Sequence, residues 1–444
     1  MAESTTYRSI ERIMVQGGPL SDLLRRTSRA YLPWDEFLTM RLPTEMSSVE
    51  TWEMLKTVNR TAGIKLPVPD LAGDQYWYLR THEIADTVCR IQCLCRQDSD
   101  LHRQLITTQN RRVLVRSRIA ETVAAALLDG LNISEEQGYT LLQSDRAPHN
   151  NTERVMVNTL TTMDLVTEMV KQPFSPELIF RLRDLLLQGL SVSSWETTPR
   201  RMGLMTSEYS DEEVQAAAER QLKYICDYAN HLTGDPHDHP VLRALFLPDL
   251  FRLYRPLPCM NSQVGRVVFR LYALKAGLPV LGMLSLSRTK LSWEDGVLDS
   301  TTVSAGPKEY SEARLHSGTD LTGYATLVVQ MALSALQDLD WQIRSLKAQD
   351  EQLRSLLQDD PRLNHRQRSV LGRALRDPGA EFRIASHRTT HSVVYATART
   401  DLLDLVDRGY LDITKRGRAY VFVPRPGMRA LLEADEGIVP SPLE

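Results

Sequence analysis

The sequence predicts a mainly α-helical protein that ends in a small domain of mixed α and β structure. Apolar residues recur at helical spacing through most of the chain. Near the C-terminus the pattern changes to alternation around a short turn, in "YLDITKRGRAYVFVP". With 444 residues, 42% of them hydrophobic and 25% charged, the chain can bury a full core in two or three domains.

Composition restricts the classes of function. The formal net charge is −3, so contact with nucleic acid would need a local basic patch. The N-terminal "MAESTTYRSIERIMVQGG" lacks the apolar core of a signal peptide. The longest apolar run, Tyr324 to Leu336, falls short of a membrane span. Five cysteines, an odd number in a large chain, suit a reducing compartment. We therefore expect a cytoplasmic protein without membrane contact.

Residues 1–75 are rich in Pro and Trp and poorly periodic. We expect an irregular or short-strand N-terminal region that packs on the helical core. Three cysteines then lie in one helical segment, "EIADTVCRIQCLCR". No His or second Cys pair stands at zinc spacing near Cys89, Cys93 and Cys95, so these are predicted to be buried structural thiols, and no metal site is expected.

Residues 76–345 are predicted to form the main helical domain. The run "RVLVRSRIAETVAAALLDG" ends at Gly130, a residue type suited to the position after a helix. Ser134, with a Gln three residues later, has the spacing of a capping box. Ser175 followed by Pro176 marks another helix start. The domain is therefore all-α.

The C-terminal part is predicted to begin with a charged linker helix over residues 346–360 and to end in a tail over residues 427–444. Between them, "LNHRQRSVLGRALRD" forms one helix, "FRIASHRTTH" begins a second, and "VVYATARTDLLDLVDRG" is a third that Gly409 closes. Two strands flank the turn at Arg416-Gly417. Three short helices followed by a hairpin, over residues 361–426, are typical of a winged helix-turn-helix domain.

The strongest candidate site is a connection between two apolar helices. The segment "YRPLPCMNSQVGR", Tyr254 to Arg266, places Arg, Asn and Ser residues just before a helix. A basic, Asn-containing connection of this kind is a natural anion site.

On these residues the chain resembles the Fic-domain (Fido-fold) proteins. Their signature, HPFx(D/E)GNGRxxR between two helices, is similar to "HPVLRALFLPDLFRLYRPLPCMNSQVGRVVFRLYALKAGLP". The segment "AETVAAALLDGLNISEEQGYTLLQ" resembles the family's inhibitory helix and its sequel. The C-terminal domain resembles the winged-helix tail of many Fic proteins. The resemblance covers roughly residues 30 to 425 and implies a Fic-like helical bundle with a C-terminal winged helix.

The resemblance also implies a chemistry. Fic proteins typically transfer AMP from ATP to a protein hydroxyl. A His in the loop acts as general base, and a carboxylate holds Mg²⁺. Backbone N–H groups of the GNG segment receive the phosphates, and two arginines clamp them.

At the matching positions this chain departs from that pattern. Arg255 stands at the base, Cys259 at the metal carboxylate, and Gln263 at the first clamp arginine. Met260 and Ser262 replace the two glycines. Arg255 cannot accept a proton at neutral pH, and a thiol is a soft ligand for a hard cation.

Two motif positions keep a functional residue type. Asn261 and Arg266 are retained, and the family's inhibitory Glu is here Asp129. In one interpretation Arg255 and Arg266 still form an anion pocket that binds a nucleotide without metal, with Asn261 beside them. In the other, the two arginines pair with carboxylates such as Asp129, which the loss of the glycines favours.

We therefore predict a Fic-like protein that has lost the AMP-transfer residues and acts as a non-catalytic regulatory or binding protein, with no cofactor. The alternative is a divergent Fic transferase that moves AMP or another phosphate-linked group, with ATP and Mg²⁺ as cofactors and Cys259 as a candidate nucleophile.

Basic residues gather on the C-terminal domain, before and on the third helix and at the hairpin turn. Phosphate contacts to DNA are a hypothesis for this set, which comprises Arg383, His387, Arg388, His391, Arg399, Lys415, Arg416 and Arg418. Against it, Asp401, Asp404 and Asp407 lie on the same helix, where we expect them on the outer or C-terminal side. Winged helices also dock proteins. DNA and an unidentified protein partner both stay open, and family analogy adds a homodimer.

Overall fold

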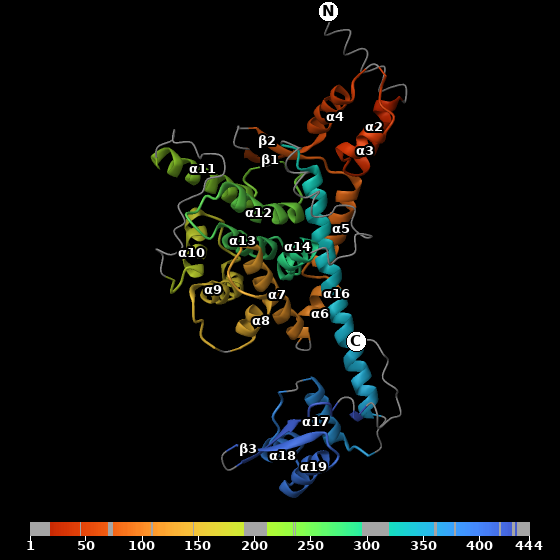
Figure 1. The fold of residues 1–444 in the computed structure, drawn as a ribbon, viewed down its shortest axis with the longest axis vertical. Helices are drawn as coiled ribbons and strands as arrows, with labels where there is room; N and C mark the ends of the chain where they lie inside the picture. The colour runs from red at the N-terminus through yellow and green to blue at the C-terminus, as the bar shows by residue number, and fades with distance from the viewer. Residues whose placement is uncertain are drawn as a thin grey trace, which may run out of the picture. The chain divides into compact units, whose positions relative to one another are not determined.

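The computed structural model is mainly helical, as predicted, with two small antiparallel sheets (Figure 1). It divides into two compact units, Met1–Asp340 (unit 1) and Trp341–Glu444 (unit 2). Within the part of the chain described, no helix is long and apolar enough to cross a membrane. The described residues are 18–44, 46–69, 74–107, 110–144, 146–190, 211–233, 235, 237–294, 319–358, 362–376, 379–416, 419–428 and 431–432.

Most of the described part of residues 1–75 is helical, so the prediction of irregular structure was wrong there, whereas a short strand is present as predicted. Its elements are α2 (Pro19–Arg29), α3 (Trp34–Thr39), α4 (Ser48–Ala62), and the paired strands β1 (Ile64–Pro69) and β2 (Gln75–Tyr78). The rings of Trp34, Phe37 and Trp52 pack together with centroids 4.9 to 5.4 Å apart. Helix periodicity is hard to detect in such short helices, and this aromatic cluster supplies the packing that stabilises them.

The remainder of unit 1 is built from helices. They are α5 (His82–Cys95), α6 (Asp100–Leu105), α7 (Arg111–Leu128), α8 (Glu135–Gln143), α9 (Asn151–Leu165), η2 (Val166–Met169), α10 (Pro176–Leu186), α11 (Asp211–Ala229), α12 (Pro240–Tyr254), α13 (Asn261–Lys275), η4 (Leu281–Met283), α14 (Leu286–Glu294) and α16 (Thr322–Gln358), which crosses the boundary between the units. The predicted helix boundaries are confirmed: Ser134 and Ser175 cap their helices, and Gly130 takes a left-handed φ of 71° after α7. Cys95 is buried as predicted, whereas Cys89 and Cys93 are exposed, so the prediction was wrong for these two thiols.

Helices α12 and α13 pack closely at the centre of unit 1 (Figure 1). A Cβ atom added to Gly265 would lie 3.0 Å from both Cα and O of Pro248, so only glycine permits this approach. The start of α12 is fixed as well, because Nδ1 of His239 accepts a hydrogen bond from the backbone N–H of Val241, with Pro240 in the first turn. Both helices are therefore held rigidly on either side of their connection.

A buried polar network precedes α12. The carboxylate of Asp238 accepts hydrogen bonds of 2.8 Å from the hydroxyls of both Tyr78 and Tyr228, and Arg243 lies 3.3 Å away. Burial raises the pKa of Asp238, although Arg243 and the two hydroxyls favour the charged form. The network ties strand β2 and helix α11 to the segment that leads into α12.

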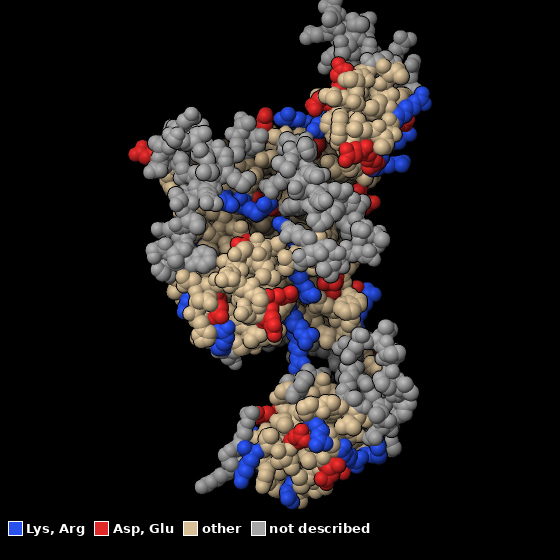
Figure 2. Space-filling model, viewed as in Figure 1, with Lys and Arg blue, Asp and Glu red and all other residues tan. Residues whose placement is uncertain are grey.

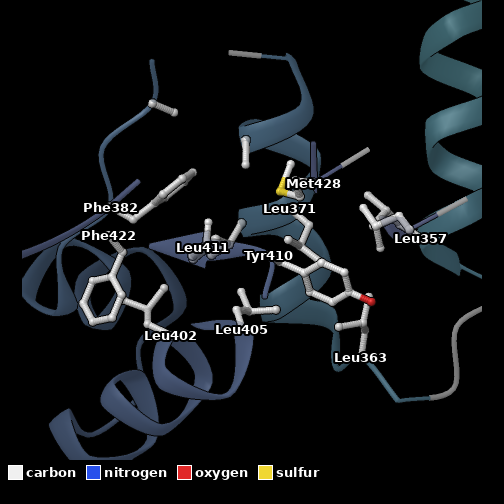
Figure 3. Close-up of a cluster of buried hydrophobic side chains, with 14 of the residues drawn as sticks. Leu357, Leu363, Leu371, Phe382, Leu402, Leu405, Tyr410, Leu411, Phe422 and Met428 are labelled. Atoms are coloured by element: carbon white, nitrogen blue, oxygen red, sulfur yellow. The ribbon is translucent and has the colours of Figure 1, made fainter. Parts of the chain in front are cut away.

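Unit 2 has the predicted sequence of elements. Its helices α17 (His365–Arg376), α18 (Ile384–His391) and α19 (Tyr395–Asp407) are followed by strands β3 (Leu411–Arg416) and β4 (Ala419–Pro424), which pair antiparallel. Gly409 has a φ of 80° and ends α19. The core, drawn in Figure 3, contains Leu371, Leu402, Leu405, Tyr410 and Phe422, and Leu357 near the end of α16 joins it.

Candidate functional site

The connection between α12 and α13 has two residues in the left-handed region. Arg255 ends α12 with a φ of 46°, and Met260 precedes α13 with a φ of 61°. This conformation costs a non-glycine residue roughly 1–2 kcal/mol. Met260 occupies a position where the resembling motif has glycine, the residue that adopts this conformation without cost. The backbone therefore keeps a glycine-like turn even though the side chain is methionine.

The side chain of Met260 points inward and is only 5% exposed. Leu257 in the same loop is also buried. The burial of these two apolar side chains offsets part of the backbone strain.

Asn261 braces the loop. Its amide nitrogen donates a 2.7 Å hydrogen bond to the carbonyl of Leu257, and its side-chain oxygen accepts a 3.0 Å bond from the N–H of the same residue. Both functional atoms of the side chain are thus used within the loop. By sequence Asn261 is a candidate for nucleotide binding, and the structure gives it this local bracing contact.

Arg266 on α13 is paired with Asp129, which caps the C-terminus of α7. Its Nη1 and Nη2 donate hydrogen bonds of 2.7 and 2.8 Å to the two carboxylate oxygens, a bidentate arrangement. The amide of Gln263 donates a third bond, of 2.9 Å, to Asp129. The side chains of Arg266 and Asp129 are only 16% and 12% exposed. The structure therefore brings three of the predicted site residues together.

A second carboxylate of α7, Glu121, also influences Arg266. It accepts hydrogen bonds of 2.8 and 2.7 Å from the backbone N–H and hydroxyl of Ser287, at the start of α14. Burial raises the pKa of Glu121. Burial alone would lower the pKa of Arg266, but attraction to Asp129 and Glu121 raises it above its ordinary value.

Glu121 was not predicted from the sequence. The signal was present in "AETVAAALLDG", because an ionisable residue at the start of a mostly apolar stretch requires a partner if that stretch is buried. That partner is the start of α14, which lies far away in the sequence.

The other two motif positions lie on the loop itself. The side chain of Arg255 is exposed, and that of Cys259 is partly buried. Among the residues that the structure describes, no three His, Cys, Asp or Glu side chains are arranged to hold a metal ion. The arrangement around Arg266 can hold α7 against α13, through the bidentate pair with Asp129 and the hydrogen bond from Gln263.

In unit 2 the side chains of Arg388 on α18, Arg399 on α19 and Lys415 on β3 are exposed. Arg418 and the side chain of Arg416 lie outside the described residues, as does most of the predicted tail. Figure 2 shows Lys and Arg side chains spread over the visible face of this unit, with a few acidic ones between them.

Two expectations for unit 2 were wrong. Asp401, expected on the outer side of α19, is only 4% exposed and accepts hydrogen bonds from Asn364, Arg366 and His387. His387, grouped with the phosphate-contacting residues, is itself buried by this contact. The hydrophobic pattern did not distinguish them because a buried ion pair looks polar in sequence.

No family model matches this sequence, and no curated protein matches it. Among solved structures, the chain is similar to a Fic family protein from Desulfovibrio desulfuricans G20, with a TM-score of 0.46 and 16% identity over 78% of this chain and 96% of that one. It is also similar to Fic-1 from C. elegans, with a TM-score of 0.41 and 15% identity over 66% of this chain and 74% of that one.

Proposed function

We propose that this chain is a Fic-like protein that does not transfer AMP and that acts by binding. The observation that carries the proposal is the state of Arg266. Both terminal nitrogens of its guanidinium donate to Asp129, and Gln263 adds a third donor to the same carboxylate. An arginine in this position would have to exchange a bidentate carboxylate for a phosphate.

The residues on the loop support the same conclusion. Arg255 stands where a general base would act and cannot accept a proton. Loss of a general base alone costs roughly 10²–10⁴ in rate. Cys259, at the position of a metal carboxylate, is a poor ligand for Mg²⁺. The base and the metal ligand are therefore both missing.

Space for the phosphates is reduced as well. The glycines of the motif let backbone N–H groups approach an anion closely. Here Met260 keeps the left-handed turn but carries a buried side chain in place of a glycine hydrogen. Asn261 uses its amide within the loop. The site therefore combines a glycine-like backbone path with side-chain contacts that are already satisfied inside the protein.

Transfer is tested by incubating the purified protein with Mg²⁺, α-³²P-labelled ATP and a cell lysate. We expect no labelled protein above background, and none with Asp129→Ala, because freeing Arg266 restores neither base nor metal ligand. Labelling by the natural protein that disappears in Arg266→Ala would overturn the proposal and favour a divergent transferase. Loss of that labelling in Cys259→Ser would then identify the thiol as a participant.

Binding is tested separately by calorimetric titration with ATP, with and without Mg²⁺. The proposal expects no heat of binding for the natural protein. Asp129→Ala is the informative variant, since it frees the guanidinium of Arg266. Binding by this variant alone would identify Asp129 as the group that closes the site, whereas binding by the natural protein would contradict the proposal that the site is closed.

We further propose that unit 2 is a winged helix that contacts DNA phosphates. Support comes from the exposed side chains of Arg388, Arg399 and Lys415, which lie on the second helix, the third helix and the hairpin. These are the elements that contact the backbone and groove of a duplex in such domains.

Fluorescence anisotropy with a labelled DNA duplex, at several salt concentrations, tests this proposal. Affinity is expected to fall steeply with salt, and the salt slope should decrease by about one for each phosphate-binding side chain removed, in Arg399→Ala or Lys415→Ala. Arg25→Ala, an exposed arginine of unit 1, should leave the slope unchanged. Absent or salt-independent binding would remove DNA as the partner and leave a protein as the alternative.

A further inference from the structure

Three histidines of unit 2 form a cluster beside the buried carboxylate of Asp401. The rings of His387 and His391, one turn apart on α18, have centroids 4.7 Å apart at an angle of 62°. The ring of His365, at the start of α17, lies 6.3 Å from that of His391 at an angle of 79°. His387 is buried, His391 partly buried and His365 exposed. The cluster therefore leads from the core of unit 2 to solvent.

Asp401 anchors the inner end of the cluster. Nε2 of His387 lies 3.2 Å from Oδ2 of Asp401. Arg366 donates to the same carboxylate from Nε at 2.6 Å and from Nη2 at 3.1 Å, and Asn364 donates at 2.9 Å. A neutral His387 that donates through Nε2 satisfies this geometry. Arg366, Asn364 and His387 therefore share one carboxylate.

The charged groups around the cluster come from each packed element. Helix α17 and the turn before it contribute His365, Arg366 and the neutral Asn364. Helix α18 and the residues before it contribute Arg383, Arg388 and Glu381. Helix α19 contributes Asp401 and Asp404. The carboxylate of Asp404 is engaged by Gln367 and Arg408, and Glu381 lies 3.9 Å from Arg383. Each of these carboxylates already has a partner.

Helix α18 depends strongly on these contacts. It has eight residues, of which only Ile384 and His387 are buried. A helix this short does not persist on its own propensity and relies on packing. The contact between His387 and Asp401 is thus a large part of what fixes α18 against α19.

We propose that the cluster of His365, His387 and His391 is an acid-sensitive latch, which holds α18 against α17 and α19 while the ring of His391 is neutral and releases α18 when His391 takes up a proton. Neutral imidazoles pack edge to face without electrostatic cost. A proton on His391 would place a positive charge in these ring contacts, where the permanently charged guanidinium of Arg366 opposes it. The latch acts on unit 2 whatever the unit binds, so it does not rest on the proposed DNA contact.

The direction of the effect follows from His391. Burial lowers the pKa of His391, and the positive charges of His387, His365 and Arg366 lower it further, against a smaller opposing effect of Asp401. A histidine with a lowered pKa in the folded state stabilises the fold above its ordinary pKa of about 6.5. That stability is lost as the pH falls from the ordinary value through the lowered one. The latch is therefore closed at pH 7.5 and opens below about pH 6.5.

Hydrogen exchange of the full chain between pH 7.5 and 5.5, expressed as protection factors, tests the latch. Protection of α18 is expected to fall by up to tenfold per pH unit below pH 6.5, for each proton taken up on opening, and protection of α7 to stay constant. His365→Gln, which changes an exposed side chain, should reduce the fall, and His391→Gln should reduce it more. His149→Gln, an exposed histidine of unit 1, is the matched control and should leave it unchanged.

Constant protection of α18 across this pH range in the natural protein would overturn the proposal, whatever the variants do. An equal fall in α7 would also overturn it, because the response would then belong to the whole protein. If both histidine variants keep the full response of the natural protein, the cluster is not its source.

Discussion

Asp129 in unit 1 and Asp401 in unit 2 are both aspartates held by an arginine and by neutral donors, yet they join different numbers of elements. Asp129 accepts three side-chain hydrogen bonds from α13, through Arg266 and Gln263. Asp401 receives donors from the turn before α17, from α17 and from α18. The first aspartate therefore fixes one helix pair, whereas the second fixes the packing of a three-helix unit.

The two aspartates also differ in the groups that donate hydrogen bonds to them. Asp129 lies at the C-terminus of α7, where the helix dipole disfavours a negative charge, so it depends on Arg266. Its donors, a guanidinium and an amide, do not titrate near neutral pH. The contacts of Asp401 include His387, whose ring packs against that of His391. The donors of Asp129 therefore keep their charge near neutral pH, whereas the proposed latch lies directly beside the ion pair of unit 2.

Removal of the unit 2 carboxylate should give the largest effect. Asp401→Ala leaves Arg366 and His387 without their shared acceptor and is expected to destabilise unit 2 by about 3–5 kcal/mol. Hydrogen exchange resolved by segment measures the loss in α17 to α19. Asp407→Ala, an exposed aspartate of the same helix, should change stability by less than about 0.5 kcal/mol. Equal effects of the two substitutions would contradict the anchoring role of Asp401.

The corresponding change in unit 1 should cost less. Asp129→Ala is expected to destabilise unit 1 by about 2–3 kcal/mol, because both partners keep some contact with water that lessens the penalty of an unpaired charge. Chemical denaturation followed by segment-resolved exchange of α7 and α13 measures it. Asp184→Ala, whose side chain is 63% exposed in its pair with Arg183, should cost less than about 1 kcal/mol. A loss for Asp129→Ala as small as this control would show that the clamp does not stabilise the helix pair.

Low pH should also reveal the contribution of Asp401 to the stability of unit 2. Although burial opposes it, hydrogen bonding to Arg366, Asn364 and His387 lowers the pKa of Asp401 to about 2. The carboxylate thus stabilises unit 2 by about 2 kcal/mol at neutral pH. This contribution is present above its ordinary pKa, near 4, and is lost as the pH falls toward 2. Between pH 4 and 2, the free energy of unfolding should therefore depend less on pH in Asp401→Asn than in the natural protein. Identical slopes of the unfolding free energy against pH would rule out this contribution.

The smallest effect is expected at the loop before α13. Arg255→Gly should stabilise unit 1 by up to about 1 kcal/mol, since glycine accepts a positive φ without strain. Met260→Gly relieves a similar strain but removes a buried side chain, so a net loss of about 1–3 kcal/mol is expected. Thermal unfolding of both variants measures the difference. A loss for both would show that the contacts of Arg255 outweigh the strain.

Much of the fold was readable from local chemistry. Ser134, Ser175 and Gly130 were assigned to helix ends because caps and left-handed glycines depend on residues close in sequence. The hairpin of unit 2 was predicted for the same reason, from alternation around a turn. The N-terminal helices were not, because they depend on an aromatic cluster assembled from two separate helices.

The candidate site shows the same division. The sequence by itself determined which chemical groups stand at residues 255–266, among them an arginine at 255 and a cysteine at 259. Only the tertiary structure decided that Asp129 pairs with Arg266, that Glu121 lies near this pair, and that Asp401 and His387 are buried together. The reason is that the identity of a side chain is local, whereas its partner and its burial are set by helices that meet across more than a hundred residues in unit 1 and across three helices in unit 2.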